Sequence, residues 1–242
     1  MAGHSKFANI KHRKGAQDAK RAKVFTKLVR EVIVASKAGG PDPDGNSRLR
    51  AAIAAARAQN VPKDRIEAAI NKGHSSGDGS NFDEIRYEGY GPGGVAIIVD
   101  SLTDNKNRTA SDVRSTFTKN GGALGESGSV SFMFDRIGLI IYDEAVIGRD
   151  KIFEQVVESG ADDYQLEEDG CQIICKPDLL NEVREYLSTI YGDPEVCRLS
   201  WQPQNFIEIT ETEKQEKILK LIDALEDNDD VQYVTGNYML VN

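Results

Sequence analysis

The spacing of apolar residues changes near residue 80, and this change divides the chain into a helical part and an α/β part. Before it, apolar side chains recur at the spacing of one helix face. The clearest example is the set Phe25, Leu28, Val29, Val32 and Ile33. From Phe82 onward, short runs with strand periodicity alternate with helical runs. The pattern therefore predicts a mixed α+β protein, with helices first and sheets after.

The helical part is predicted to be a three-helix bundle that follows a basic arm, residues 1–20. The first helix carries the apolar stripe and stops at Gly39-Gly40, since glycine commonly ends helices. Asn46 is suited to cap a second helix that runs to about Gln59. Pro62 is suited to open a third helix, which ends at Gly73.

The α/β part is predicted to contain three groups of elements. The first group comprises strands Ile85–Tyr90, Val95–Leu102 and Ser129–Phe134 with a helix Thr109–Lys119. The second has the order β-α-β-β-α-β: Gly138–Tyr142, Lys151–Ser159, Tyr164–Glu167, Gln172–Lys176, Pro177–Tyr191 and Val196–Trp201. The third is strand Phe206–Ile209, helix Thr212–Leu225 and strand Gln232–Leu240. The order of the second group is that of a ferredoxin-like domain.

The third group is too small to be stable alone, so we expect it to complete the domain begun by the first group. The predicted domains are a basic arm and helical bundle (1–75), a discontinuous α/β domain (80–134 plus 204–242) and an inserted ferredoxin-like domain (136–202). The predicted fold class is thus α+β multidomain: an N-terminal three-helix bundle followed by two ferredoxin-like α/β domains, one inserted in the other.

Basic and acidic residues are also distributed unequally between the two parts of the chain. The first 72 residues contain 16 basic and 6 acidic residues, and the remaining 170 contain 14 and 33. Between Lys6 and Arg30 there are nine basic residues and one acid. A solvated helix face usually alternates in sign, so this run favours contact with a polyanion over simple solvation.

The predicted nucleic-acid-binding residues combine cations with an aromatic ring and side chains able to contact bases. They are Lys6, Phe7, Asn9, Lys11, His12, Arg13, Lys14, Lys20, Lys23, Lys27 and Arg30. In the helix, Lys20, Lys23, Lys27 and Arg30 lie roughly opposite the apolar stripe.

No feature of the sequence predicts an enzyme, a cofactor or a metal site. The Gly-rich segments 90–94 and 121–128 lack the Gly-Lys-Ser/Thr ending of a phosphate cradle, so we interpret them as turns. The acidic pairs, including Asp229-Asp230, fall at predicted turns, where carboxylates are usually solvated. Val130, Phe132 and Phe134 alternate as a core face would.

Cysteine usage and hydropathy predict a cytoplasmic protein with no membrane partner. Cys171, Cys175 and Cys197 are odd in number and include no C-x-x-C pair, which favours a reducing compartment. No apolar run approaches the ~18 residues of a membrane span, and no secretory signal is recognised.

Several segments together resemble the YebC family, whose mitochondrial relatives include the translational activator of cytochrome oxidase. They are Ala2–Lys14, Tyr87–Pro92, Leu102–Asn105, Asn107–Thr109 and Gly121–Gly125. The resemblance covers essentially the whole chain. One departure is Phe7, where the family often has tryptophan; the aromatic ring is kept.

The resemblance implies an N-terminal helical domain, two α/β domains and a cytoplasmic, cofactor-free protein that acts on gene expression. It leaves two roles open: a DNA-binding transcriptional regulator, or a ribosome-associated factor that relieves translational stalling. The expected partner is accordingly duplex DNA or ribosomal RNA. The acidic domains could also meet the ribosome or basic proteins, which leaves a protein-interaction adaptor as a third function.

Overall fold

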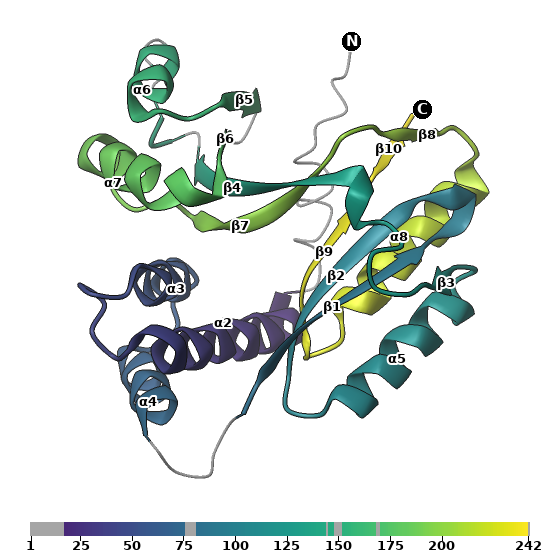
Figure 1. Cartoon of the computed structure of the whole chain (residues 1–242), viewed down its shortest axis with the longest axis horizontal. Coiled ribbons are helices and arrows are strands. Elements are labelled where there is room, and N and C mark those ends of the chain that lie inside the picture. Colours follow the sequence, from purple (N-terminus) through teal and green to yellow (C-terminus); the bar gives the residue numbers. More distant parts are fainter. Residues whose placement is uncertain (1–16, 76–80, 144, 148–151, 168–169, 242) are drawn as a thin grey trace. The chain divides into compact units, whose positions relative to one another are not determined.

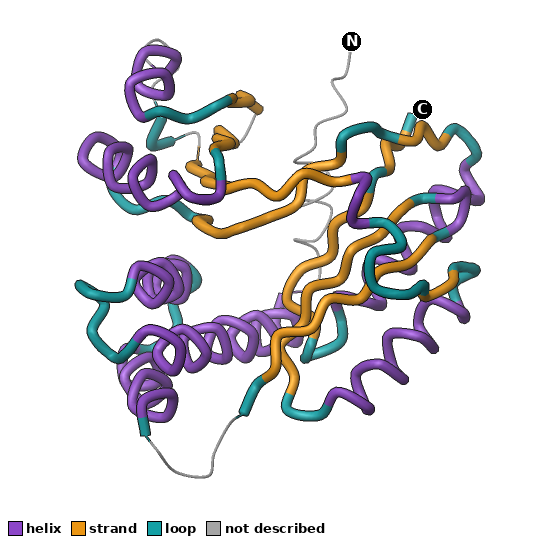
Figure 2. The backbone as a smooth tube through the Cα atoms, viewed as in Figure 1, coloured by secondary structure: helices purple, strands orange, loops and turns teal. Residues whose placement is uncertain are grey.

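The computed structural model describes residues 17–75, 81–143, 145–147, 152–167 and 170–241. It confirms a mixed α+β fold in which a helical region precedes the sheets (Figures 1 and 2). The described residues form two compact units. The first contains those up to Lys27, those from 81 to Asp135 and those from Gln202 onward. The second contains those from Leu28 to 75 and from Arg136 to Trp201.

All three predicted helices are present: α2 (Gln17–Gly39), α3 (Ser47–Ala58) and α4 (Lys63–His74). Asn46 caps α3 as predicted, because its Oδ1 accepts from the Leu49 amide at 3.0 Å. Its Nδ2 also donates to the carbonyls of Ala35 and Gly40, both at 2.8 Å. This one buried amide therefore starts α3 and holds the end of α2.

Gly73 permits close contact between α4 and α2. A Cβ at this position would lie 2.3 Å from the Ile33 carbonyl oxygen, whereas one at Gly45 would have no atom nearer than 4.0 Å. We expect Gly73→Ala to lower the free energy of unfolding of the second unit by about 1–3 kcal/mol through overpacking. Urea denaturation followed by the fluorescence of Trp201 measures this. Gly45→Ala is the control, and equal stability of the two variants would contradict the prediction.

The first unit is built on a four-stranded sheet in the order β3-β1-β2-β9. Its strands are β1 (Asp83–Tyr90), β2 (Ala96–Thr103), β3 (Ala123–Leu124) and β9 (Val231–Gly236). Helices α5 (Lys106–Lys119) and α8 (Thr212–Glu226) contribute Phe117, Ile218 and Leu221 to a core shared with Ile97 and Val99 of β2. Since β9 pairs with β2, the C-terminal stretch completes a sheet begun before residue 135.

The second sheet has the order β5-β6-β4-β7. It comprises β4 (Phe134–Asp143), β5 (Asp163–Glu167), β6 (Gly170–Cys175) and β7 (Val196–Pro203). Between these strands run α6 (Ile152–Ser159) and α7 (Leu180–Tyr191). Ile152, Val156, Val183 and Leu187 from the helices are buried against the sheet. Strands and helices thus follow one another in the predicted β-α-β-β-α-β sequence.

The predicted strand Ser129–Phe134 is wrong. Ser131–Met133 is a short 3-10 turn, and β4 begins only at Phe134. The amides of Val130 and Ser131 donate to the carboxylate of Glu88 and not to a neighbouring strand. Phe132 is consequently 66% exposed, although Val130 and Phe134 are buried as predicted.

The predicted last strand, Gln232–Leu240, is interrupted at Asn237. The side-chain oxygen of Asn237 accepts from the Ala96 amide at 2.8 Å, and its backbone carbonyl accepts from the Ile207 amide at 2.7 Å. After this residue the chain forms β10 (Tyr238–Leu240), which pairs in parallel with β8 (Ile207–Ile209). One buried asparagine therefore directs the chain from one sheet to another. No helix among the described residues is long and apolar enough to cross a membrane.

Candidate functional site

Most of the predicted nucleic-acid-binding residues lie outside the described part of the chain. These are Lys6, Phe7, Asn9, Lys11, His12, Arg13 and Lys14. Lys20 belongs to α2, where its backbone is described, and Arg30 is half-buried on the same helix. Their role in binding stays a prediction.

Lys23 and Lys27 both contact the C-terminal end of α8. The ammonium of Lys23 donates to the Asp227 carbonyl at 2.9 Å and lies 3.2 Å from the Asp227 carboxylate. The ammonium of Lys27 donates to the Glu226 carbonyl at 2.6 Å. The last carbonyls of a helix carry partial negative charge, so these lysines cap α8. The predicted cationic face of α2 is therefore partly engaged within the first unit.

Burial lowers the pKa of Lys27, and the opposing charges of Glu226 and Asp229 only partly restore it. A buried ammonium is costly unless it is paired and hydrogen-bonded, which the end of α8 provides. We infer that Lys27 mainly joins the start of α2 to the end of α8 within the first unit. A polyanion that approached this position would compete with the acidic end of α8.

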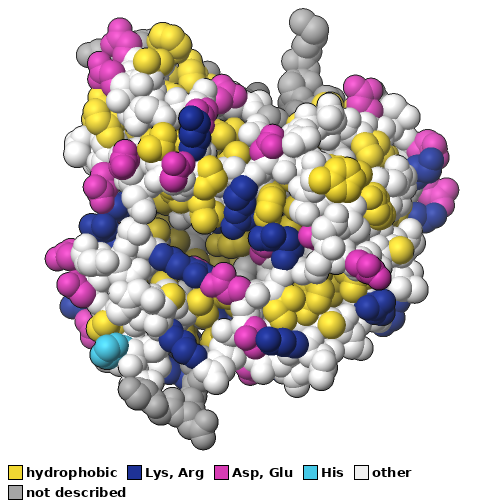
Figure 3. Space-filling view, viewed as in Figure 1, with side chains coloured by type: hydrophobic (Ala, Val, Ile, Leu, Met, Phe, Trp, Pro, Cys, Tyr) yellow, Lys and Arg dark blue, Asp and Glu magenta, His cyan; other side chains and the backbone are white. Residues whose placement is uncertain are grey.

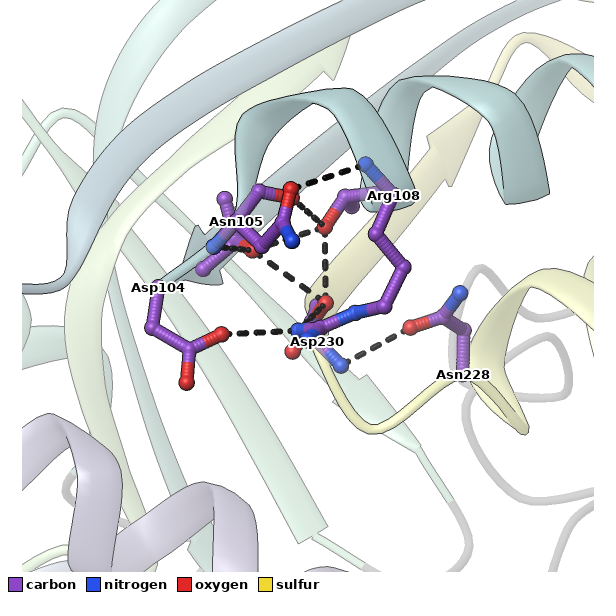
Figure 4. Close-up of polar contacts among 7 residues, drawn as sticks. Asp104, Asn105, Arg108, Asn228 and Asp230 are labelled. Carbon is purple, nitrogen blue, oxygen red and sulfur yellow. Dashed lines mark hydrogen bonds and ion pairs between the residues drawn. The ribbon is translucent and has the colours of Figure 1, made fainter.

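The segment from Thr103 to Thr109 forms a polar network around Asp230 (Figure 4). The Asp230 carboxylate is only 5% exposed. One of its oxygens accepts from the hydroxyls of Thr103 at 3.2 Å and Thr109 at 2.7 Å, and from Nη2 of Arg108 at 2.7 Å. Arg108 is half-exposed and also contacts the Asp104 carboxylate at 2.8 Å.

Asn105 connects this network to the start of α5. Its side chain accepts from the Arg108 amide at 3.1 Å, which makes it the N-cap, and its own amide donates to the Thr103 hydroxyl at 2.9 Å. The Asp230 carbonyl accepts from the Leu102 amide at 2.8 Å. The network thus joins β2, the start of α5 and the residue before β9. Asp230 is not the solvated turn residue that the sequence suggested.

Glu88 organises the Gly-rich loop that precedes β4. Its buried carboxylate accepts from the amides of Gly128, Val130 and Ser131 at 2.8–2.9 Å. Burial alone would raise the pKa of Glu88, but these hydrogen bonds outweigh it and lower the pKa. Gly128 has a positive φ of 86°, which favours glycine and agrees with the predicted turn. The turn prediction for 121–128 is wrong at Ala123–Leu124, which form the short strand β3 paired with β1.

The cysteines do not provide a reactive thiolate. Burial raises the pKa of Cys171 and Cys197 to about 12 and that of Cys175 to about 11. All three thiols are therefore protonated at neutral pH, the form that is a poor nucleophile. Within the described residues, no group of three His, Cys, Asp or Glu side chains could hold a metal ion.

Two family models together match almost the whole chain. The model of the TACO1/YebC N-terminal domain matches residues 5–76, and the model of the second and third TACO1/YebC domains matches residues 82–238. The chain belongs to the TACO1/YebC family. This confirms the resemblance inferred from the sequence motifs. The interval between the two matches contains the change in periodicity near residue 80.

Individual relatives are similar over nearly their full lengths. A protein of Rickettsia bellii named "probable transcriptional regulatory protein" is 55% identical over 240 residues, which cover 99% of this chain and 94% of the relative. The crystal structure of a conserved hypothetical protein from Aquifex aeolicus matches with a TM-score of 0.92 and 44% identity, covering 98% of each chain. The TACO1/YebC fold described above therefore extends to a crystallographically determined relative.

Within this TACO1/YebC chain, the motifs that carry the family resemblance have identifiable structural roles. Glu88, in the motif Tyr87–Pro92, holds the Gly-rich loop, and Asn105 and Arg108 organise the start of α5. Sequence reasoning missed Asp230, because a buried acid at a turn is indistinguishable from a solvated one until its partners are known.

Proposed function

We propose that this TACO1/YebC chain is a non-enzymatic, nucleic-acid-binding regulator of gene expression that acts in the cytoplasm. The observation that carries the proposal is the run from Lys6 to Arg30, with nine basic residues and one acid. The name of the Rickettsia relative supports a regulatory role. The odd number of cysteines and the lack of a C-x-x-C pair favour a reducing compartment.

Duplex DNA is the first proposed target, since the relative is named for transcriptional regulation. Ribosomal RNA is the second, and the side chains of Phe7, Asn9 and His12 favour it, because ring stacking and base-edge hydrogen bonds suit unpaired bases. Lys23 and Lys27 are expected to add little to either, since α8 already compensates their charge.

We also propose the finer domain organisation inferred from the sequence. Pairing of β2 with β9 supports a discontinuous domain of residues 80–134 plus 204–242. The sheet order β5-β6-β4-β7, with antiparallel pairing of β6 to both β4 and β5, supports an inserted ferredoxin-like domain at 136–202.

Replacing Lys11, Arg13 and Lys14 together by glutamine tests the basic arm. Each phosphate contact adds about 0.9 to the slope of log affinity against log salt on duplex DNA, so losing three contacts should reduce the slope by about 2.7. Fluorescence anisotropy across a salt series, with a 20-base-pair duplex and a ribosomal RNA hairpin as probes, measures the slope.

The matched control replaces Arg57, Lys63 and Arg65, three exposed cations of the helical region, by glutamine. It removes the same charge and should leave the slope nearly unchanged. Equal losses in both triple variants would show general electrostatic attraction and contradict a site in the arm. Competition between the two probes at one salt concentration separates the DNA role from the RNA role.

A further inference from the structure

Helix α6 carries two apolar stripes, and the sheet covers only one of them. Ile152 and Val156 are buried in the core of the second unit. Phe153 and Val157, each one position further along, are 62% and 60% exposed. Since residues four apart lie above one another on a helix, these two side chains form one outward ridge.

The exposed apolar surface continues from α6 onto β5. The Phe153 and Tyr164 rings lie 6.5 Å apart between centroids. Leu166, two residues further along β5 and so on the same strand face, is 37% exposed. The sheet order places β5 at an edge, where one side of its backbone is available for pairing.

The orientation of α6 is held by contacts with α7. The Tyr186 hydroxyl donates to the Glu158 carboxylate at 2.5 Å and lies 3.1 Å from the side-chain oxygen of Gln155. These bonds tie the inner side of α6 to the neighbouring helix, which keeps Phe153 and Val157 directed away from the core. The ridge is therefore a preformed surface feature.

Acidic side chains lie on the same elements as this apolar surface. Residues 152–166 contain four acidic residues and no lysine or arginine. All four are exposed: Glu154 and Glu158 on α6, Asp162 in the turn before β5 and Asp163 at the start of β5. Figure 3 shows hydrophobic and acidic side chains gathered over the part of the surface that α6 occupies. A negative rim around apolar residues attracts positively charged partners and repels nucleic acid.

We propose that α6 and β5 form a docking surface for a basic polypeptide segment that carries apolar side chains. The apolar side chains would bury Phe153, Val157 and Leu166, and lysine or arginine would pair with the acidic rim. Charge complementarity selects this partner over a second copy of the chain, whose own α6–β5 surface has the same negative charge. The inference does not depend on the proposed nucleic-acid function, because that function uses the basic arm.

Binding of defined peptides to the full-length protein tests the proposal. The probe is a fluorescein-labelled nine-residue peptide of alternating lysine and leucine, followed by anisotropy. Two matched peptides replace every leucine by serine or every lysine by glutamate. We expect the double variant Phe153→Ser/Val157→Ser to bind the first peptide at least about tenfold more weakly than wild type, because two large contacts are lost without a change of charge.

The matched control is Val146→Ser/Leu199→Ser, which removes two exposed apolar side chains elsewhere in the same unit and should bind within about twofold of wild type. Circular dichroism and Trp201 fluorescence confirm that each variant is folded. A further variant, Glu154→Gln/Asp162→Asn, should weaken binding most at low salt.

Three outcomes would overturn the proposal. The first is equal peptide affinity of the two apolar double variants, or equal affinity of wild type for the leucine and serine peptides. Either result would show that net charge alone accounts for binding. The second is a dimer in sedimentation that depends on Phe153, which would assign the surface to a second copy. The third is markedly tighter peptide binding after deletion of residues 2–14, which would assign the surface to the chain's own basic arm.

Discussion

Replacing Asp230 by alanine is expected to destabilise the first unit by about 3–5 kcal/mol, the cost of breaking a buried charged network. The change leaves the hydroxyls of Thr103 and Thr109 and the Arg108 guanidinium without their common acceptor. The lost hydrogen bonds are the ones that link β2, the start of α5 and the residue before β9. Hydrogen–deuterium exchange in β2, α5 and β9, together with urea denaturation, measures the loss.

Asp112→Ala, at an exposed position of α5, is the control and should change stability by less than about 0.5 kcal/mol. Arg108→Ala should cost less than Asp230→Ala, because the arginine is half-exposed and water can replace part of its contacts. If Asp230→Ala were as stable as Asp112→Ala, the network would have no role in joining the sheet to α5.

Replacing Glu88 by alanine is expected to release the Gly-rich loop and lower the free energy of unfolding by about 3 kcal/mol or more. Each amide hydrogen bond to a charged acceptor contributes about 1.5–3 kcal/mol, and three are lost at Gly128, Val130 and Ser131. Loss of exchange protection in residues 125–134 measures the release. Glu126→Ala, in the same loop but exposed, is the control and should keep this protection.

The Glu88 contribution should also depend on pH. Because the folded pKa of Glu88 is lowered, its carboxylate stabilises the protein fully above the unfolded-state pKa, and this stability is lost as pH falls through the folded value. The stability difference between wild type and Glu88→Gln should therefore be largest at neutral pH and shrink below about pH 4.5. A difference that stays constant from pH 7 to 3 would show that the shape of the side chain, not its charge, holds the loop.

Local patterns in the sequence predicted most of the secondary structure. The cap at Asn46, the glycine stop after α2 and the helices α7 and α8 depend on nearby residues, so periodicity and capping chemistry were sufficient. Helix α5 begins at Lys106 and not at the predicted Thr109, because Asn105 caps it. Prediction failed at Ser129–Phe134 and at Asn237. At Ser129–Phe134, the Glu88 carboxylate accepts the amide hydrogen bonds that a strand would have used. At Asn237, the side-chain oxygen accepts from the amide of Ala96, which lies far away along the chain.

The candidate site was predictable only in part, for a similar reason. Charge composition identified α2 as a cationic helix, but the contacts of Lys23 and Lys27 with α8 involve residues about 200 positions away. Periodicity assigned Phe132 to the core, although the loop held by Glu88 leaves it exposed. Composition counts charges without showing which of them neutralise one another.

The sequence by itself determined the order of helices and strands, the separation of basic and acidic regions and membership of the TACO1/YebC family. These properties depend on neighbouring residues or on sums along the chain. They can therefore be predicted without knowing the long-range contacts. The tertiary structure alone decided which charged side chains pair with other parts of the chain. It also decided that Asp230 and Glu88 are buried and that Phe153 and Val157 of α6 remain exposed. Those outcomes depend on desolvation and pairing between residues far apart in sequence, and only the folded chain brings such residues together.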